Sequence, residues 1–127
     1  MKDVLERVLY VEDDPDIRAV GALALGLGGI KVKSCASGDE AVAAAATFGP
    51  QLILLDVMMP GMDGPATLEA LRALDATAAT PVVFMTAKVQ PTQVAVYRQM
   101  GAVEVIPKPF DPMTLAAVIR EIYVRAA

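Results

Sequence analysis

The sequence contains no histidine and no tryptophan, and its only cysteine is Cys35. Histidine is the most common general base and metal ligand, so its absence excludes a histidine-dependent active site and a phosphohistidine carrier. A single cysteine cannot form an internal disulfide, which is typical of a reducing compartment, and we predict that Cys35 is buried and inert. No apolar run approaches the roughly 20 residues of a membrane-spanning helix. We therefore expect a cytoplasmic protein that does not interact with membranes.

The composition indicates one globular domain with an acidic surface. The chain has 127 residues, of which 55% are apolar, and its formal net charge is −4. That length and apolar content are sufficient for a single hydrophobic core, so we expect one domain over residues 1–127. The basic residues are scattered along the chain rather than clustered. This distribution argues against binding to nucleic acid and suits a metal cation better.

Short apolar runs alternate with longer amphipathic segments, which is the pattern of βα units around a mostly parallel sheet. The predicted strands cover residues 7–11, 31–35, 51–55, 81–85 and 103–107. Helices are predicted in the intervals and after the last strand. The sequence therefore predicts an α/β fold with five such units.

Five helix starts are predicted from capping residues and prolines. An acid before a proline supplies both a capping side chain and a first helical residue that needs no N–H. A serine followed three residues later by glutamate forms a capping box. The predicted starts are Asp14-Pro15, Ser37 with Glu40, Gly64-Pro65, Gln90-Pro91 and Asp111-Pro112.

Polar residues follow four of the five predicted strands at the point where each strand ends. Glu12 and Asp13 follow the first strand, Asp56 ends the third, Thr86 ends the fourth, and Lys108 follows the fifth. In a doubly wound parallel sheet, groups that meet a ligand gather at the carboxyl ends of the strands. We therefore expect these five side chains to lie together.

Each of these residues also has an ordinary structural interpretation. Asp56 could initiate a turn, Thr86 could end a strand, and Lys108 could be a solvated loop charge. The joint placement favours a site, because three carboxylates brought together without a cation repel one another. Hard oxygen ligands without histidine indicate Mg²⁺. Mg²⁺ and Lys108 together balance the three negative charges of the acids. Asp56 is then a candidate nucleophile that could accept a phosphoryl group. The Thr86 hydroxyl could donate a hydrogen bond to that group.

Four segments resemble the signatures of the receiver domain of two-component response regulators, in the order and spacing of that family. They are LYVEDDPDIR, LILLDVMMPGMDG, VVFMTA and PKPFDP. The resemblance covers essentially the whole chain. It implies a flavodoxin-like, doubly wound sheet of five parallel strands in the order 2-1-3-4-5, with five helices.

The resemblance also implies a role for each residue of the site. Asp56 would accept a phosphoryl group from a phosphohistidine on a sensor histidine kinase or histidine phosphotransfer protein. Asp13, Asp56 and the Met58 carbonyl would bind Mg²⁺, with Glu12 acting through water. Thr86 and Lys108 would contact the phosphoryl group, and the Lys108-Pro109 bond would be cis.

The family resemblance predicts a signalling protein rather than an enzyme. It would catalyse only its own phosphorylation and dephosphorylation, as a monomer or weak homodimer, and phosphorylation would change its binding to a downstream protein that the sequence does not identify. The chain would be either a single-domain regulator or a receiver excised from a longer one.

Several residues depart from the family pattern. Glu12 replaces the more common aspartate, and Val105 stands where an aromatic residue is frequent. Tyr97 is predicted to be a partly exposed packing residue of the fourth helix. Met58 and Lys88 stand at the two positions that flank the path of the hydrolytic water in this family.

Three other functions compete with the receiver. A phosphohydrolase with an aspartate nucleophile would need an acid at position 58, which holds methionine. A nucleotide-binding module would need a glycine-rich or hydroxyl-rich loop after the first strand, where Glu12, Asp13 and Asp14 would repel phosphate. The stronger alternative is a receiver-like interaction module that is never phosphorylated.

Overall fold

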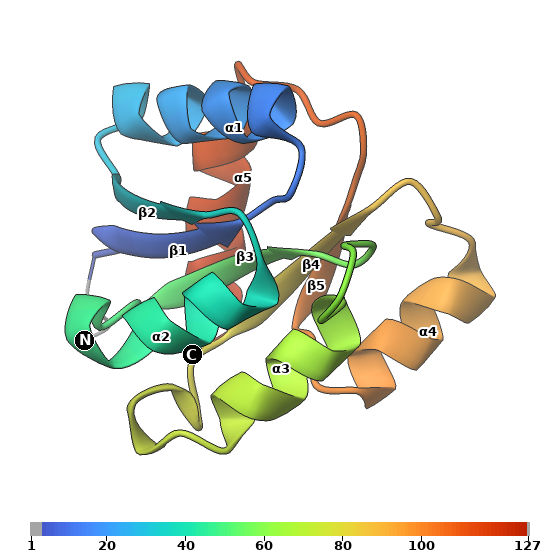
Figure 1. The fold of residues 1–127 in the computed structure, drawn as a ribbon. Helices are drawn as coiled ribbons and strands as arrows, with labels where there is room; N and C mark the ends of the chain where they lie inside the picture. Colours follow the sequence, from blue (N-terminus) through green and yellow to red (C-terminus); the bar gives the residue numbers. More distant parts are fainter. Residues whose placement is uncertain (1–3, 127) are drawn as a thin grey trace.

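A single sheet of five parallel strands occupies the centre of the computed structural model, which describes residues 4–126 (Figure 1). The strand order is β2-β1-β3-β4-β5, as the family resemblance implied. Every neighbouring pair is parallel, so the carboxyl ends of all strands lie at one edge of the sheet. The strands are β1 (Arg7–Val11), β2 (Lys31–Cys35), β3 (Leu52–Asp56), β4 (Val82–Thr86) and β5 (Glu104–Pro107).

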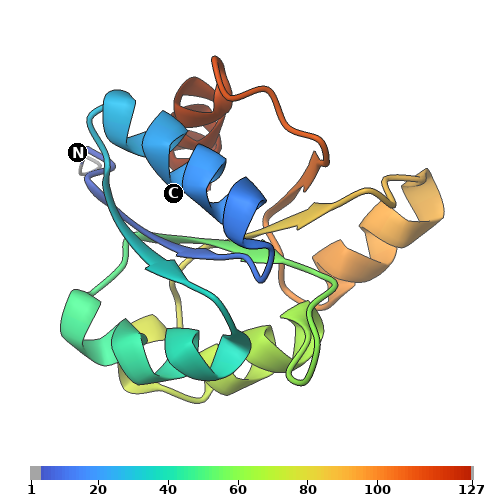
Figure 2. The ribbon, with the colours of Figure 1, turned by 45° about the horizontal axis from the view of Figure 1, so that its top comes forward.

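Helices cover both faces of the sheet (Figure 2). One face carries α1 (Pro15–Leu27) and α5 (Leu115–Arg125), and the other carries α2 (Gly38–Phe48), α3 (Gly64–Arg72) and α4 (Pro91–Gln99). A short 3-10 helix, η1 (Asp75–Thr77), precedes β4. Within residues 4–126, no helix has the length and apolar character needed to cross a membrane.

Two hydrophobic cores lie on opposite faces of the sheet, because successive side chains of a strand point to opposite sides. In β4, for example, Phe84 packs toward α2, α3 and α4, whereas Val83 and Met85 pack toward α1 and α5. The central strands β3 and β4 are buried along their whole length. For this reason the sequences of both strands are almost continuously apolar.

The helix starts were mostly predicted correctly. Asp14 caps α1, where its Oδ1 accepts hydrogen bonds from the N–H groups of Asp16 and Ile17 at 2.9 and 3.1 Å. Ser37 Oγ accepts a hydrogen bond from the Glu40 N–H at the start of α2. At α3 the helix begins at Gly64 as predicted, and the capping side chain is Asp63.

The predicted start of the last helix was wrong. The helix α5 begins at Leu115 rather than at Pro112. Asp111 Oδ1 accepts a hydrogen bond from the Met113 N–H at 2.9 Å, so this acid closes a turn before the helix. An Asp-Pro pair provides the same capping chemistry for a turn as for a helix, and the sequence alone did not distinguish them.

The exposure predicted for Tyr97 was wrong, whereas its packing role and the burial predicted for Cys35 were correct. Tyr97 is only 7% exposed, and its ring packs edge-on against Phe84 with centroids 5.4 Å apart. Cys35 is buried, and this burial raises the pKa of its thiol. A buried thiol with a raised pKa is a poor nucleophile.

Candidate functional site

Asp56 lies at the carboxyl end of β3, in the middle of the sheet edge. The β3 strand pairs with β1 on one side and with β4 on the other, which aligns the ends of the three strands. Asp56 is 4% exposed, and Glu12, which follows β1, is 1% exposed. Ionisable side chains are rarely buried to this extent unless they are paired or bind a ligand.

Three carboxylates meet at this edge. Glu12, Asp13 and Asp56 each place one carboxylate oxygen within 4.8 Å of the others. Glu12 and Asp56 are buried, and Asp13 is half-buried at the mouth of the cluster. The sequence-based expectation that these acids lie together is therefore met in the structure.

Lys108 reaches into the same cluster from the loop after β5. Its Nζ lies 2.6 Å from Glu12 Oε1 and 3.4 Å from Asp56 Oδ1. The Lys108-Pro109 peptide bond is cis, as the family resemblance implied. The backbone N–H of Lys108 donates a hydrogen bond to the Thr86 carbonyl at 2.9 Å. The loop that carries the lysine is thus tied to the end of β4.

Burial raises the pKa of the Asp56 carboxyl to about 7. The neighbouring Glu12 and Asp13 carboxylates act in the same direction, whereas Lys108 opposes them. Burial alone would lower the pKa of Lys108, but its contacts with Glu12 and Asp56 outweigh burial and raise it. Without a further cation, the site therefore holds a proton on Asp56 more strongly than an ordinary aspartate does.

The loops after β3 and β4 supply the remaining predicted residues. Thr86 is 2% exposed, and its Oγ1 accepts a hydrogen bond from the Lys88 N–H at 3.0 Å. Because a hydroxyl that accepts a bond can still donate its own proton, Thr86 remains able to donate to a ligand. The Met58 N–H donates to Asp56 Oδ1 at 3.4 Å, while the Met58 side chain is exposed.

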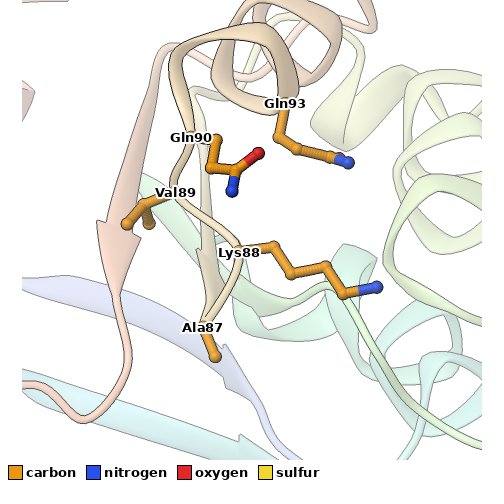
Figure 3. A pocket seen from close by; sticks show the side chains of 5 residues that line it. All are labelled: Ala87, Lys88, Val89, Gln90 and Gln93. Atoms are coloured by element: carbon orange, nitrogen blue, oxygen red, sulfur yellow. The ribbon is translucent and has the colours of Figure 1, made fainter.

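A pocket lies beside this site on the loop between β4 and α4. Figure 3 shows that the side chains of Lys88, Gln90 and Gln93 project to one side of the loop, and that Val89 projects to the other. Lys88 also lines the neighbouring groove with Met58. The side chains of Met58 and Lys88 therefore face one groove.

Gly64 lets α3 begin directly against the end of β3. A Cβ atom at this position would lie 2.7 Å from the Asp56 carbonyl oxygen, and the Gly64 N–H donates to the Val57 carbonyl at 2.8 Å. A larger residue would displace the backbone that carries Asp56. This glycine was predicted only as part of a helix start.

One residue near the site was not predicted from the sequence. Arg18 Nη1 donates to the backbone carbonyls of Glu12 and Asp13, at 2.9 and 3.3 Å. A basic residue four positions after the capping Asp14 was the available signal, since α1 starts at the site and its second turn can face back toward it.

The donor set fits Mg²⁺ better than a softer metal. The cluster offers three carboxylate oxygens, and neither histidine nor an accessible thiol. Mg²⁺ prefers hard oxygen ligands and retains several waters. Burial and then the neighbouring Glu12 carboxylate raise the pKa of Asp56, and Lys108 offsets them only in part.

Comparison with known families identifies the family of the chain. The family described as the response regulator receiver domain matches residues 8–120, which include all of the predicted site residues. The chain belongs to this family. Receiver domains are the signalling domains of two-component systems, and the buried Asp56 is consistent with the role of a phosphoacceptor.

Sequence relatives and solved structures agree with this assignment. The chain is 33% identical over 120 residues to the DNA-binding response regulator MtrA of Mycolicibacterium smegmatis, covering 94% of this chain and 51% of MtrA. It is 35% identical over 115 residues to the transcriptional regulatory protein CseB of Streptomyces avermitilis, covering 91% and 48%. The chain thus spans about half the length of these curated relatives.

Among solved structures, the chemotaxis response regulator CheY4 of Vibrio cholerae superposes with a TM-score of 0.86 at 30% identity, covering 93% of this chain and 98% of CheY4. The beryllofluoride-activated receiver domain of Klebsiella pneumoniae RstA superposes with a TM-score of 0.81 at 31% identity, covering 93% and 98%. Both similarities extend over nearly the whole of this chain.

Proposed function

We propose that Asp56 accepts a phosphoryl group from a phosphohistidine on a partner protein, and that this Mg²⁺-dependent modification switches the binding of a downstream protein. The observation that carries the proposal is the position of Asp56. It is buried at the end of the central strand, beside the acids Glu12 and Asp13 and 3.4 Å from Lys108. An aspartate with a purely structural role would not require these charged neighbours.

In the proposed reaction, a carboxylate oxygen of Asp56 attacks phosphorus. The P–O bond to Asp56 forms as the P–N bond to the donor imidazole breaks, which leaves an acyl phosphate on Asp56 and the histidine on the partner. The reaction needs Asp56 in its ionised form. Positive charge beside the carboxylate favours that form and opposes the effect of burial.

The other side chains would position and screen the transferred group. Lys108 supplies an ammonium 3.4 Å from Asp56 and would contact a phosphoryl oxygen. Thr86 would donate its hydroxyl proton to another oxygen. Preorganised donors of this kind stabilise the charge that develops during phosphoryl transfer.

Asp13, Asp56 and the Met58 carbonyl would hold Mg²⁺, with Glu12 acting through water. The bound cation would screen the phosphoryl oxygens from the surrounding carboxylates. Glu12 has a second role that needs no metal, because its 2.6 Å contact with Lys108 holds the lysine at the site.

A protein donor is supported by the exposed face of α1, which begins beside the site. Val20, Leu23 and Leu27 recur at i, i+3 and i+7 and are 46%, 63% and 81% exposed. One side of the helix is therefore an apolar stripe in contact with solvent. Such a surface suits a helical protein partner better than a small phosphate donor.

The proposal is tested by incubating the chain with acetyl phosphate and Mg²⁺ and measuring its intact mass. We expect a phosphoryl adduct that is absent in Asp56→Asn and in excess chelator. A purified histidine phosphotransfer domain loaded with phosphate should transfer it to the wild-type chain only. An unmodified wild-type chain under all these conditions would favour the alternative, an interaction module that is never phosphorylated.

A further inference from the structure

Arg18 holds the backbone of the two acids that follow β1. The last sheet hydrogen bond of this segment runs from the Glu12 N–H to the Cys35 carbonyl at 3.0 Å. Beyond it, the Glu12 and Asp13 carbonyls both accept hydrogen bonds from Arg18 Nη1, at 2.9 and 3.3 Å. Beyond the end of the sheet, hydrogen bonds from one guanidinium nitrogen therefore hold the backbone of both acids.

Arg18 is itself held by the hydrogen bonds of helix α1. Arg18 lies in the first turns of α1, where its own N–H donates to the Asp14 carbonyl at 2.9 Å. The Asp14 side chain caps the same helix, and the Asp14 N–H donates to Glu12 Oε2 at 3.2 Å. The loop from Glu12 to Asp14 is thus fastened at its carbonyls by Arg18 and at the Glu12 carboxylate by Asp14.

We infer that Arg18 is a positioning residue for cation binding and phosphoryl transfer. It keeps the β1–α1 loop in the conformation that directs the Glu12 and Asp13 carboxylates at Asp56. This inference rests on the proposed function, since it assigns Arg18 to the same site without a contact to phosphorus or metal. Residues that orient metal ligands from outside the coordination sphere are commonly worth about tenfold or more in metal affinity.

The charge of Arg18 and its positioning role predict opposite effects on Mg²⁺ affinity when Arg18 is removed. Because a guanidinium beside the acids repels a divalent cation, its loss by electrostatics alone would strengthen Mg²⁺ binding. Loss of the two hydrogen bonds would free the loop and weaken Mg²⁺ binding. Lysine at this position keeps the charge but lacks the guanidinium whose Nη1 atom supports both carbonyls, so the two variants separate the two effects.

The test measures the dissociation constant of Mg²⁺ by titration calorimetry in wild type, Arg18→Ala, Arg18→Lys and Lys31→Ala. The last variant removes one positive charge from an exposed residue where β2 begins, at the opposite edge of the sheet. We expect about tenfold weaker Mg²⁺ binding in Arg18→Ala, a smaller loss of at least threefold in Arg18→Lys, and no change in Lys31→Ala.

A kinetic readout separates positioning from a general loss of structure. At a temperature where circular dichroism shows all variants folded, raising Mg²⁺ should restore the rate of Arg18→Ala phosphorylation by acetyl phosphate. Tighter or unchanged Mg²⁺ binding in Arg18→Ala, or a rate that saturating Mg²⁺ does not restore, would overturn the inference. A wild-type chain that neither binds Mg²⁺ nor reacts would instead overturn the proposed function.

Discussion

Lys108 is closer to Glu12 than to Asp56. Its Nζ lies 2.6 Å from the Glu12 carboxylate and 3.4 Å from that of Asp56. Glu12 is the more deeply buried acid and has the longer side chain. Lys108 therefore has a partner other than the proposed phosphoacceptor, and removing the charge of Asp56 does not leave a half-buried lysine unpaired.

The first prediction follows from that pairing. Asp56→Asn should raise the melting temperature in chelator by about 5 °C, because it removes one of three mutually repelling carboxylates while Lys108 keeps Glu12. Differential scanning calorimetry in chelator at about pH 8, where the Asp56 carboxyl is ionised, measures the shift. The same variant should gain less stability from added Mg²⁺ than the wild type does, because it binds the ion more weakly.

Glu12→Gln provides the matched comparison, since it also replaces one carboxylate by an amide. We expect it to lower the melting temperature in chelator, because it removes the closest partner of Lys108. A stabilising effect of equal size in both variants would indicate that only the total charge matters and that the short Glu12–Lys108 contact contributes nothing specific.

The second prediction concerns pH in the absence of metal. Burial raises the pKa of Asp56 from 3.8 to about 7 in the folded chain. The folded state therefore binds this proton more tightly than the unfolded state does. The resulting stabilisation is complete below about pH 4 and is lost as the pH rises through about 7. Its size is on the order of a few kcal/mol.

This dependence is measured by urea denaturation in chelator between about pH 5 and pH 8. The free energy of unfolding of the wild type relative to Asp56→Asn should fall across this range, since the amide does not titrate. Saturating Mg²⁺ should flatten the difference, because the ion stabilises the carboxylate. If the free energies of unfolding of the two proteins changed with pH in parallel in chelator, the Asp56 carboxyl would titrate normally.

Much of the fold was predictable because strong local signals coincided with it. Asp14 and Pro15 specify both the cap and the first residue of α1. The buried runs of β3 and β4 end on Asp56 and Thr86, and parallel pairing then brings those ends together without further information. The acid cluster was predictable for the same reason, since it depends on strand ends rather than on side-chain conformations.

The errors arose where packing between distant segments decides the outcome. Tyr97 is buried because Phe84 of β4 presents its ring to α4, a contact that the sequence of α4 does not encode. Arg18 contacts the site because its side chain folds back along α1 toward the loop before it. At Asp111 the reverse holds. The capping residue was recognised correctly, but it closes a turn rather than starting a helix.

The third prediction concerns the lifetime of the phosphorylated state. Met58 follows Asp56 by two residues, and its thioether side chain extends into solvent at 64% exposure. A thioether cannot orient an attacking water as a carboxylate or amide can. Phosphorylated wild type should therefore lose phosphate slowly, and Met58→Asn and Met58→Glu should each accelerate the loss by about tenfold.

The rate is measured after removal of acetyl phosphate, by following the phosphorylated fraction on affinity gels. Met58→Leu serves as the control, because it keeps an apolar side chain of similar volume and should leave the rate unchanged. If neither polar variant hydrolyses faster than wild type, position 58 has no influence on the attacking water.

The fourth prediction concerns the exposed face of α1. Leu23→Asp should slow phosphotransfer from a histidine phosphotransfer domain by about tenfold, because it places a charge in the proposed contact surface. The rate with acetyl phosphate should not change. Val124→Asp is the matched control, since Val124 is an exposed apolar residue of α5 at 65% exposure, compared with 63% for Leu23. Equal effects of both substitutions would place the contact elsewhere.

The last prediction concerns how phosphorylation at Asp56 affects the face formed by α4, β5 and α5. Val105 pairs with Phe84 across β4 and β5, and it stands where the family resemblance implied an aromatic residue. Its short, β-branched side chain cannot swing between two positions as a ring can. The aromatic contact with Phe84 is instead made by Tyr97 from α4.

We therefore expect beryllofluoride with Mg²⁺ to shift backbone NMR resonances most strongly at Asp56, Thr86 and Lys88, and less strongly at Val105. Val105→Tyr should enlarge the response on that face if the missing ring limits it. The ring would lie on the α4 side of the sheet, since Val105 packs against the core that contains Phe84 and Tyr97. Val105→Ile controls for the change in volume. A large wild-type response at Val105 that the tyrosine leaves unaltered would show that the signal reaches this face without an aromatic residue at position 105, and that its absence from the sequence has no consequence for transmission.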